Sequence, residues 1–201
     1  MKYKIIIFLI LMFLMLFLIY VFNQDKEIYY VNIDTTKNNN YQKTIKKYYQ
    51  GQKKLEKYIN EFSIQDFRTT DLIRDIKDNK KINNQTIQNA LIKSDLLILN
   101  VGINDINYKI GNTNKEELYQ FTDQVLLDIE ELFKLIRIYS KEKVYFIGFK
   151  NTNGISYNEY YLYTNKRLKS ICNQYKITFI DINKEKNSDQ IIVNTILNNI
   201  Y

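Results

Sequence analysis

Short apolar runs alternate with longer segments of helical period along most of this chain. Continuous apolar runs predict strands that are buried on both faces of a parallel sheet, because a strand with one wet face alternates apolar and polar residues. Helices between such strands imply right-handed crossovers. We therefore predict an α/β fold, a three-layer α/β/α sandwich around a five-stranded parallel sheet. The predicted strands are Ile28–Ile33, Glu61–Ile64, Asp95–Val101, Lys143–Phe149 and Lys176–Ile182.

Helical period fills the segments between these strands. Five strands suit the flavodoxin-like order 2-1-3-4-5, in which ligands bind outside the carboxyl ends of the strands, at the switch point between strands one and three. Functional residues are therefore expected in the loops after the strands. The predicted helices are Tyr41–Asn60, Thr69–Asp78, Gln85–Ile92, Lys115–Ser140, Tyr157–Gln174 and Asp189–Asn199.

The N-terminus carries an uninterrupted apolar run over residues 5–22. At about 1.5 Å per residue, a helix of this length spans roughly 27 Å, close to the thickness of a bilayer's hydrocarbon core. Lys2 and Lys4 precede the run and favour a cytoplasmic N-terminus. No small-residue cleavage site comes after it, which favours an anchor over a signal peptide. We predict a transmembrane anchor at residues 1–23 and one extracytoplasmic domain at residues 24–201, held at the cell membrane by this single pass.

Charge and motifs exclude several functions. The net charge is +7, but basic residues are interspersed with acidic ones and no nucleic-acid motif is present, so no nucleic acid is expected as a partner. The glycines form neither a dinucleotide fingerprint nor a P-loop. With one cysteine and no histidine, no zinc site of cysteine and histidine ligands is expected, and no cofactor is predicted. A lysine cluster on one predicted helix is either a solvated face or a contact for anionic lipid or wall polymer. It comprises Lys43, Lys46, Lys47, Lys53, Lys54 and Lys57.

An apolar strand running into Gly102-Ile103-Asn104-Asp105 is the most informative motif. This run resembles the third block, Gly-x-Asn-Asp, of the SGNH (GDSL-type) hydrolases, and residues 67–72 are similar to the stretch just after that family's second block. The resemblance covers residues 28–200. It implies an SGNH-hydrolase-like fold and an esterase-like site, with Gly102 and Asn104 at the oxyanion position and Asp105 beside them. Without the resemblance, the same residues are a strand-to-loop turn in which Asn104 bonds local backbone.

The other blocks of the family are altered in this chain. Gly-Asp-Ser corresponds to Ile33-Asp34-Thr35, so Asp34 is kept and threonine takes the place of the nucleophilic serine. A threonine hydroxyl can attack, although its β-methyl group crowds the reaction; alternatively, Thr35 caps the next helix. Asp66 corresponds to the second-block glycine, where a carboxylate would repel a developing oxyanion. Losing one oxyanion donor already costs about 2.7–4 kcal/mol.

The fourth block, Asp-x-x-His, lacks its base because the chain contains no histidine. Asp189 and Glu185 are candidate substitutes, but an exposed carboxylate is a poor base for a hydroxyl. Asp189 is also explained as a stabilising charge at a helix N-terminus. A triad without its base loses orders of magnitude in rate. Tyrosines near this region are either a helix face or a platform that stacks on sugars or acyl chains. They are Tyr157, Tyr160, Tyr161 and Tyr163.

These residues support two functions from different classes. The first is a degenerate, membrane-anchored SGNH-hydrolase-like pseudoenzyme that binds a glycan, lipid or protein partner in the former cleft. The second is a weak ester hydrolase that uses Thr35 as nucleophile and Asn104 with Gly102 as oxyanion donors. The missing serine and histidine favour the first.

Overall fold

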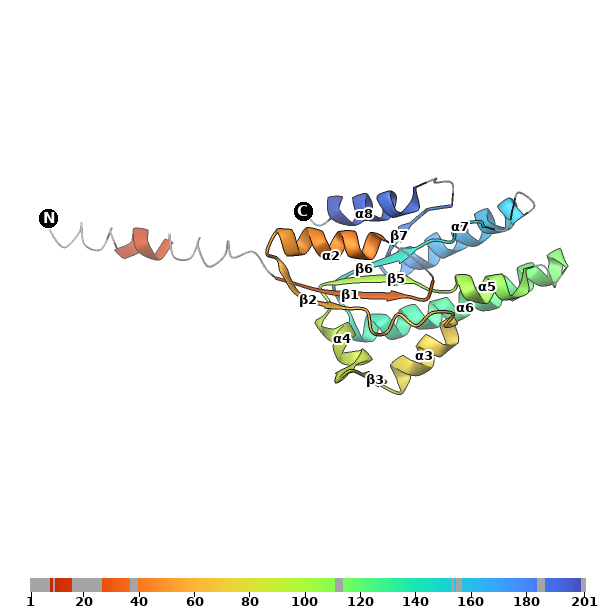
Figure 1. The fold of residues 1–201 in the computed structure, drawn as a ribbon, viewed down its shortest axis with the longest axis horizontal. Helices are drawn as coiled ribbons and strands as arrows, with labels where there is room; N and C mark the ends of the chain where they lie inside the picture. The colour runs from red at the N-terminus through yellow and green to blue at the C-terminus, as the bar shows by residue number, and fades with distance from the viewer. Residues whose placement is uncertain are drawn as a thin grey trace.

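A five-stranded parallel sheet lies between two layers of helices (Figure 1). The computed structural model describes Phe8 and residues 10–15, 27–36, 40–110, 114–152, 154, 157–183 and 187–199. The sheet order is β2-β1-β5-β6-β7, and every neighbouring pair is parallel. This confirms the predicted α/β fold with its parallel sheet. The strands are β1 (Ile28–Asp34), β2 (Leu55–Ile59), β5 (Leu96–Asn100), β6 (Lys143–Ile147) and β7 (Thr178–Ile180).

The two faces of the sheet are covered by different helices. One face packs against two helices, α2 (Tyr41–Gly51) and α8 (Ser188–Asn198), which also contact each other. The opposite face carries the larger core and the remaining helices (Figure 1). These are α3 (Thr69–Lys77), α4 (Ile87–Lys93), α5 (Ile103–Lys109), α6 (Lys115–Tyr139) and α7 (Asn158–Gln174).

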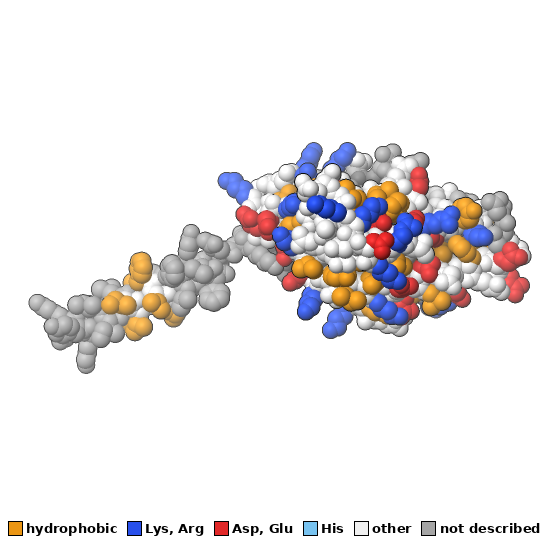
Figure 2. Space-filling view, turned by 90° about the horizontal axis from the view of Figure 1, so that it is seen from below, with side chains coloured by type: hydrophobic (Ala, Val, Ile, Leu, Met, Phe, Trp, Pro, Cys, Tyr) orange, Lys and Arg blue, Asp and Glu red, His pale blue; other side chains and the backbone are white. Residues whose placement is uncertain are grey.

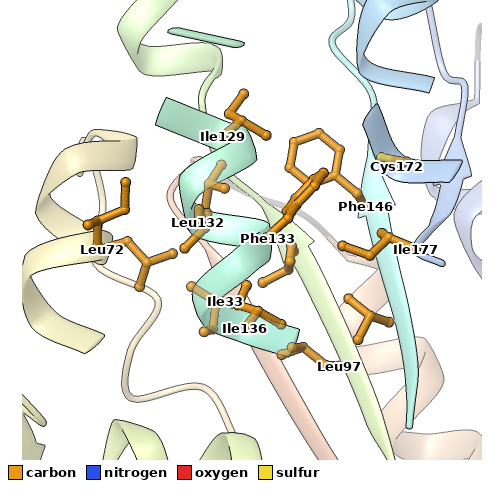
Figure 3. Close-up of a cluster of buried hydrophobic side chains, with 14 of the residues drawn as sticks. Ile33, Leu72, Leu97, Ile129, Leu132, Phe133, Ile136, Phe146, Cys172 and Ile177 are labelled. Carbon is orange, nitrogen blue, oxygen red and sulfur yellow. The ribbon is translucent and has the colours of Figure 1, made fainter. Parts of the chain in front are cut away.

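Alternate side chains of the central strands enter the two cores. In β5, Leu97 and Leu99 belong to the larger core and Leu96 and Ile98 to the smaller one. All four are buried, which is why this strand reads as a continuous apolar run. Figure 3 shows the larger core, where the rings of Phe133 and Phe146 meet edge to face with centroids 5.2 Å apart. Helix α6 thus buries its apolar stripe against the sheet.

The predicted helix Tyr41–Asn60 and strand Glu61–Ile64 are wrong. The helix ends at Gly51, and the second strand is β2 (Leu55–Ile59). The chain turns between them with Lys53 at φ 55°, in the left-handed region. Strand β2 lies at the edge of the sheet and is mostly accessible to solvent, so it lacks the continuous apolar run of a central strand. Its polar residues fit a helical period, which is why the helix was predicted to continue to Asn60.

Two further elements differ from the prediction. A short hairpin of β3 (Lys81–Ile82) and β4 (Gln85–Thr86) precedes α4, which begins at Ile87 and not at Gln85. Strands of two residues are too short to show a period. Helix α5 begins directly after Gly102, where we expected a loop. Asn104 therefore lies in the first turn of a helix and not in a loop.

The predicted membrane anchor falls mainly outside the described residues. Of residues 1–23, only Phe8 and residues 10–15 are described, and they are helical. Within the described part of the chain, no helix is both long and apolar enough to cross a membrane. The anchor therefore stays a prediction.

Candidate functional site

A cavity of about 530 Å³ lies at the carboxyl edge of the sheet. The segments after all five strands of the main sheet contribute to it, as expected for the switch point of such a fold. Its lining mixes amides, hydroxyls and one lysine with apolar side chains. The lining residues are Thr36, Asp66, Asn100, Ile103, Asn104, Asn107, Gly148, Phe149, Lys150, Thr152, Ile182, Ser188 and Ile192.

Asp34 ends β1 and is almost completely buried. Its Oδ1 accepts hydrogen bonds from the backbone N–H and the hydroxyl of Thr36, at 2.8 and 2.7 Å. Its Oδ2 accepts from the Tyr41 hydroxyl at 2.6 Å, Gln42 Nε2 at 3.0 Å and Asn100 Nδ2 at 3.2 Å. Burial, and then the charge of Asp34, raise the pKa of Tyr41 well above its usual value. Asp34 therefore holds the loop after β1 against β5 and α2.

Thr35 is 1% exposed and does not line the cavity. Its hydroxyl lies 3.3 Å from the Asn100 carbonyl oxygen, to which it donates, and 3.3 Å from Asn104 Nδ2, from which it accepts. Neither partner is a carboxylate that could take up a proton. The threonine that lines the cavity is the next residue, Thr36. Sequence reasoning missed Thr36 because it lies outside the family's three-residue block.

The Asn104 amide and the backbone N–H of Asp66, the counterpart of the second-block glycine that the resemblance implies as an oxyanion donor, point at one atom, the carbonyl oxygen of Thr35. Asp66 N–H donates to this oxygen at 3.1 Å, and Asn104 Nδ2 donates to it at 2.9 Å. Asn104 Nδ2 also donates to the Phe67 carbonyl at 3.1 Å. An oxyanion hole needs donors aimed at the place where the substrate oxygen will carry charge. Here the chain's own backbone occupies them.

Asp66 and Gly102 share a left-handed backbone conformation. Asp66 has φ 63°, in the left-handed region that favours glycine. The backbone at the second-block position therefore has a conformation that suits the glycine of the family's block. Its carboxylate is exposed and belongs to the cavity lining. Gly102 has φ 96° and starts α5. A Cβ there would lie 2.9 Å from Ile129 Cδ1 and 3.0 Å from Phe149 Cζ, so close packing also demands glycine.

Asp105 joins two helices and does not line the cavity. Its Oδ2 accepts from the backbone N–H and the hydroxyl of Thr69, both at 2.9 Å, where α3 begins. Burial raises the pKa of the Asp105 carboxyl, while the hydrogen bonds from Thr69 oppose that rise. Its role in this structure is to fix α5 against α3.

The raised pKa of Asp105 makes stability depend on pH. Because the folded chain holds this proton more tightly than the unfolded chain, the contribution of Asp105 to stability falls as pH rises above the usual carboxyl value of 3.8. Asp105→Asn keeps an acceptor oxygen for Thr69 and removes the titration. We expect the stability of the wild type relative to this variant to decline between pH 4 and pH 7 in urea unfolding. A difference that rises with pH would contradict the burial argument.

Asp189 lies away from the cavity lining, in the first turn of α8, and its Oδ2 accepts from the Asn40 backbone N–H at 3.3 Å. Glu185 lies outside the described residues. The cavity is lined instead by Ser188, the residue before Asp189, at the start of α8. Its Oγ accepts a hydrogen bond from Lys150 Nζ at 3.0 Å. Sequence reasoning missed this pair; the position of Lys150 directly after a predicted strand was the available signal.

A second hollow of about 540 Å³ lies beside the first, over the ends of β1 and β2. Thr36 lines both hollows, so they adjoin at this residue. Every residue around the second hollow is polar. They are Asp34, Thr36, Asn40, Gln42, Lys43, Asn60, Ser63 and Gln65.

The tyrosines after β6 belong mainly to the core. Tyr160 and Tyr161 are buried; the Tyr160 hydroxyl lies 2.5 Å from that of Thr122, and the Tyr161 hydroxyl donates to Asn107 at 3.0 Å. None of the predicted platform tyrosines lines the cavity. Among the described residues, no cluster of histidine, cysteine, aspartate or glutamate could hold a metal ion.

The parallel sheet with a cavity at its carboxyl edge defines an α/β fold of the flavodoxin-like class. No protein-family model matches the chain, and no curated protein matches it. Solved structures do. Axe2, an acetylxylan esterase from Geobacillus stearothermophilus, superposes with a TM-score of 0.57 at 13% identity over 86% of this chain and 80% of its own. The acetyl xylan esterase AlAXEase gives 0.54 at 14% identity over 84% and 83%.

A third similar structure, BT4096, a gut microbial diltiazem-metabolizing enzyme, has a TM-score of 0.61 at 15% identity. The match covers 86% of this chain but only 40% of BT4096. The chain therefore shares its fold with these two acetyl xylan esterases and with part of BT4096. At these identities the likeness concerns the fold alone.

Proposed function

We propose that this chain is a non-catalytic binding protein on an SGNH-hydrolase-like scaffold, and that it takes a glycan in the cavity at the carboxyl edge. The observation that carries the proposal is the position of the Thr35 carbonyl oxygen, which receives hydrogen bonds from both Asp66 N–H and Asn104 Nδ2. Transition-state stabilisation by these donors requires them to be free for the substrate. Rearranging them would break two hydrogen bonds.

The remaining catalytic parts also argue against acyl transfer. The chain has no histidine, and the Thr35 hydroxyl is buried between a backbone carbonyl and an amide. Losing one oxyanion donor costs about 2.7–4 kcal/mol, which is a factor of roughly 10² to 10³ in rate. Loss of the base adds further orders of magnitude.

A glycan fits the chemistry of the cavity better than an acyl chain. Amide and hydroxyl side chains of the lining, among them Asn107, Thr152 and Ser188, are groups that exchange hydrogen bonds with sugar hydroxyls. The adjoining second hollow is lined only by polar residues. Two of the similar structures are named as acetyl xylan esterases, so carbohydrate is the ligand class that the scaffold suggests.

One experiment separates binding from catalysis. The purified chain is assayed for turnover of a short-chain aryl ester, and for binding of acetylated and unacetylated xylo-oligosaccharides by calorimetry. We expect no turnover above the blank, and binding that Lys150→Ala weakens about tenfold, the loss of one hydrogen bond from a charged group. Lys169→Ala is the matched control, because Lys169 is exposed on α7 and does not line the cavity.

Ester turnover that Thr35→Ala abolishes would overturn the proposal and restore the weak hydrolase. A variant of that alternative uses Thr36, which lines the cavity and whose hydroxyl donates to the Asp34 carboxylate at 2.7 Å. Turnover lost in Thr36→Val but kept in Thr35→Ala would identify this pair. If turnover and binding of every oligosaccharide are both absent, the glycan proposal fails.

We also propose that residues 1–23 anchor the chain in the cell membrane with the domain on the extracytoplasmic side. The support is the apolar run at residues 5–22 with Lys2 and Lys4 before it. Flotation of the full chain with phosphatidylcholine vesicles tests the anchoring, and we expect the chain to float with them.

A further inference from the structure

The strands of the main sheet all run in one direction, so their amino ends share one edge, opposite the cavity. Strand β1 begins at Ile28, and the chain therefore enters the domain at this amino edge (Figure 1). Only residues 24–27 separate the proposed anchor from β1. Even fully extended, these residues span at most about 14 Å. An anchored domain must therefore hold its amino edge close to the lipid surface.

Exposed lysines stand on the connections that reach this edge, at Lys53, Lys93, Lys141 and Lys176. Among the ion pairs of the described residues, none involves these four. Three acidic residues lie at the same edge: Glu27, Asp95 and Glu142. Asp95 Oδ2 accepts from the Tyr29 backbone N–H at 2.9 Å. Basic side chains therefore predominate among the exposed groups.

Two isoleucines beside these lysines are exposed. Ile92 is 60% and Ile138 is 64% exposed. Each lies two residues before a serine, and the hydroxyls of these serines, Ser94 and Ser140, are 3.1 Å apart. The ends of α4 and α6 thus meet at this edge, where Lys93 and Lys141 adjoin the two serines in sequence. Figure 2 shows hydrophobic, basic and acidic side chains interspersed over the face that it presents.

Arg137 holds two of the edge loops together. Its guanidinium donates to the Ser140 and Glu142 carbonyls, at 3.2 and 3.0 Å, in the connection between α6 and β6. It also donates to the Tyr175 and Lys176 carbonyls, at 2.8 and 2.6 Å, after α7. Lys141 and Lys176 are therefore carried by loops that are fixed relative to each other.

We propose that this amino-edge surface, formed by Lys53, Lys93, Lys141, Lys176, Ile92 and Ile138, rests on anionic phospholipid headgroups. Lysines near an anionic leaflet are attracted to it, and exposed isoleucines beside them can enter the headgroup region. This contact rests on the proposed anchor but is independent of the ligand in the cavity. It turns the cavity away from the membrane, toward ligands in the surrounding space.

Energy transfer from the full chain to a headgroup-labelled lipid tests the contact. One fluorophore is attached at Gln52→Cys, at the amino edge, and in a second protein at Glu116→Cys, in the first turn of α6 at the opposite end. Cys172 stays unlabelled, because it is buried and burial raises the pKa of its thiol to about 12. The vesicles contain phosphatidylcholine alone or equal parts of phosphatidylcholine and phosphatidylglycerol.

We expect phosphatidylglycerol to raise transfer from position 52 about twofold, and high salt to remove the rise, since the Debye length is about 8 Å at physiological ionic strength and shorter above it. Transfer from position 116 should not change. The triple variant Lys53→Glu, Lys93→Glu, Lys141→Glu should lose the rise. The matched triple Lys47→Glu, Lys166→Glu, Lys169→Glu, with the same change in net charge on helix bodies, should keep it.

Equal energy transfer in both lipid mixtures would overturn the inference. Loss of the increase in the matched triple variant would also overturn it, because the effect would then depend on net charge alone. Binding of a soluble polyanion without any lipid effect would assign the surface to a polymer instead. If the full chain does not float with phosphatidylcholine vesicles, the anchor fails and this contact fails with it. The calorimetric titration with oligosaccharides would still test glycan binding in the cavity, independently of the membrane contact.

Discussion

Replacing Asp34 by alanine should lower the free energy of unfolding by about 3–5 kcal/mol, because it leaves several buried donors without an acceptor, and each unsatisfied group costs about 1–3 kcal/mol. The substitution removes the acceptor of at least five hydrogen bonds, from Thr36, Tyr41, Gln42 and Asn100. The Tyr41 hydroxyl is hardest to compensate, because Tyr41 is fully buried and water cannot replace the lost acceptor. The loop after β1 should loosen with it.

Urea unfolding measures this loss, and two variants control it. Asp34→Asn keeps the shape and one acceptor oxygen, and we expect a loss of about 1–3 kcal/mol. Asp189→Ala removes a partly exposed carboxylate that accepts one hydrogen bond at 3.3 Å, and its effect should stay within about 1 kcal/mol. A loss of less than that in Asp34→Ala would show that the network does not hold the loop.

Replacing Gly102 by alanine should cost about 2–5 kcal/mol of stability, because two penalties combine. Its φ of 96° strains any residue with a Cβ. The new methyl group would also lie 2.9 Å from Ile129 Cδ1 and 3.0 Å from Phe149 Cζ, in the core under α5. Relief requires α5 to move, which would shift Asn104 away from the Thr35 carbonyl.

Gly154→Ala separates the two penalties. Gly154 has nearly the same φ, 94°, but a Cβ there would meet nothing within 4 Å. Its substitution should therefore cost only the backbone strain, about 1–2 kcal/mol. Unfolding in urea compares the two variants. Equal losses would mean that the core yields freely to the methyl group at Gly102.

The sheet was predictable where its strands are buried on both faces. Strands β5 and β6 read as continuous apolar runs because helices cover both of their faces. The edge strand β2 was misplaced, since only one of the five residues of Leu55–Ile59 is buried and their pattern does not differ from that of a helix. The hairpin β3–β4 was missed because two residues per strand carry no period.

The site was predictable in position but not in geometry. The strand ending at Gly102-Ile103-Asn104-Asp105 located the cavity, and the absence of histidine removed the family's base. No local pattern could predict that Asn104 and Asp66 both donate to the Thr35 carbonyl. That arrangement depends on how closely three loops, after β1, β2 and β5, approach one another.

By itself, then, the sequence determined the class of fold, the edge that carries the cavity and the lack of a histidine base, because periodicity and residue identity are local properties. Only the tertiary structure decided that the oxyanion donors are occupied, that Thr36 and not Thr35 reaches the cavity, and that Lys150 and Ser188 meet there. Those outcomes depend on contacts between residues far apart in the chain. The buried Asp34 network, which joins β1 to Asn100 on β5, holds Thr36 in its place.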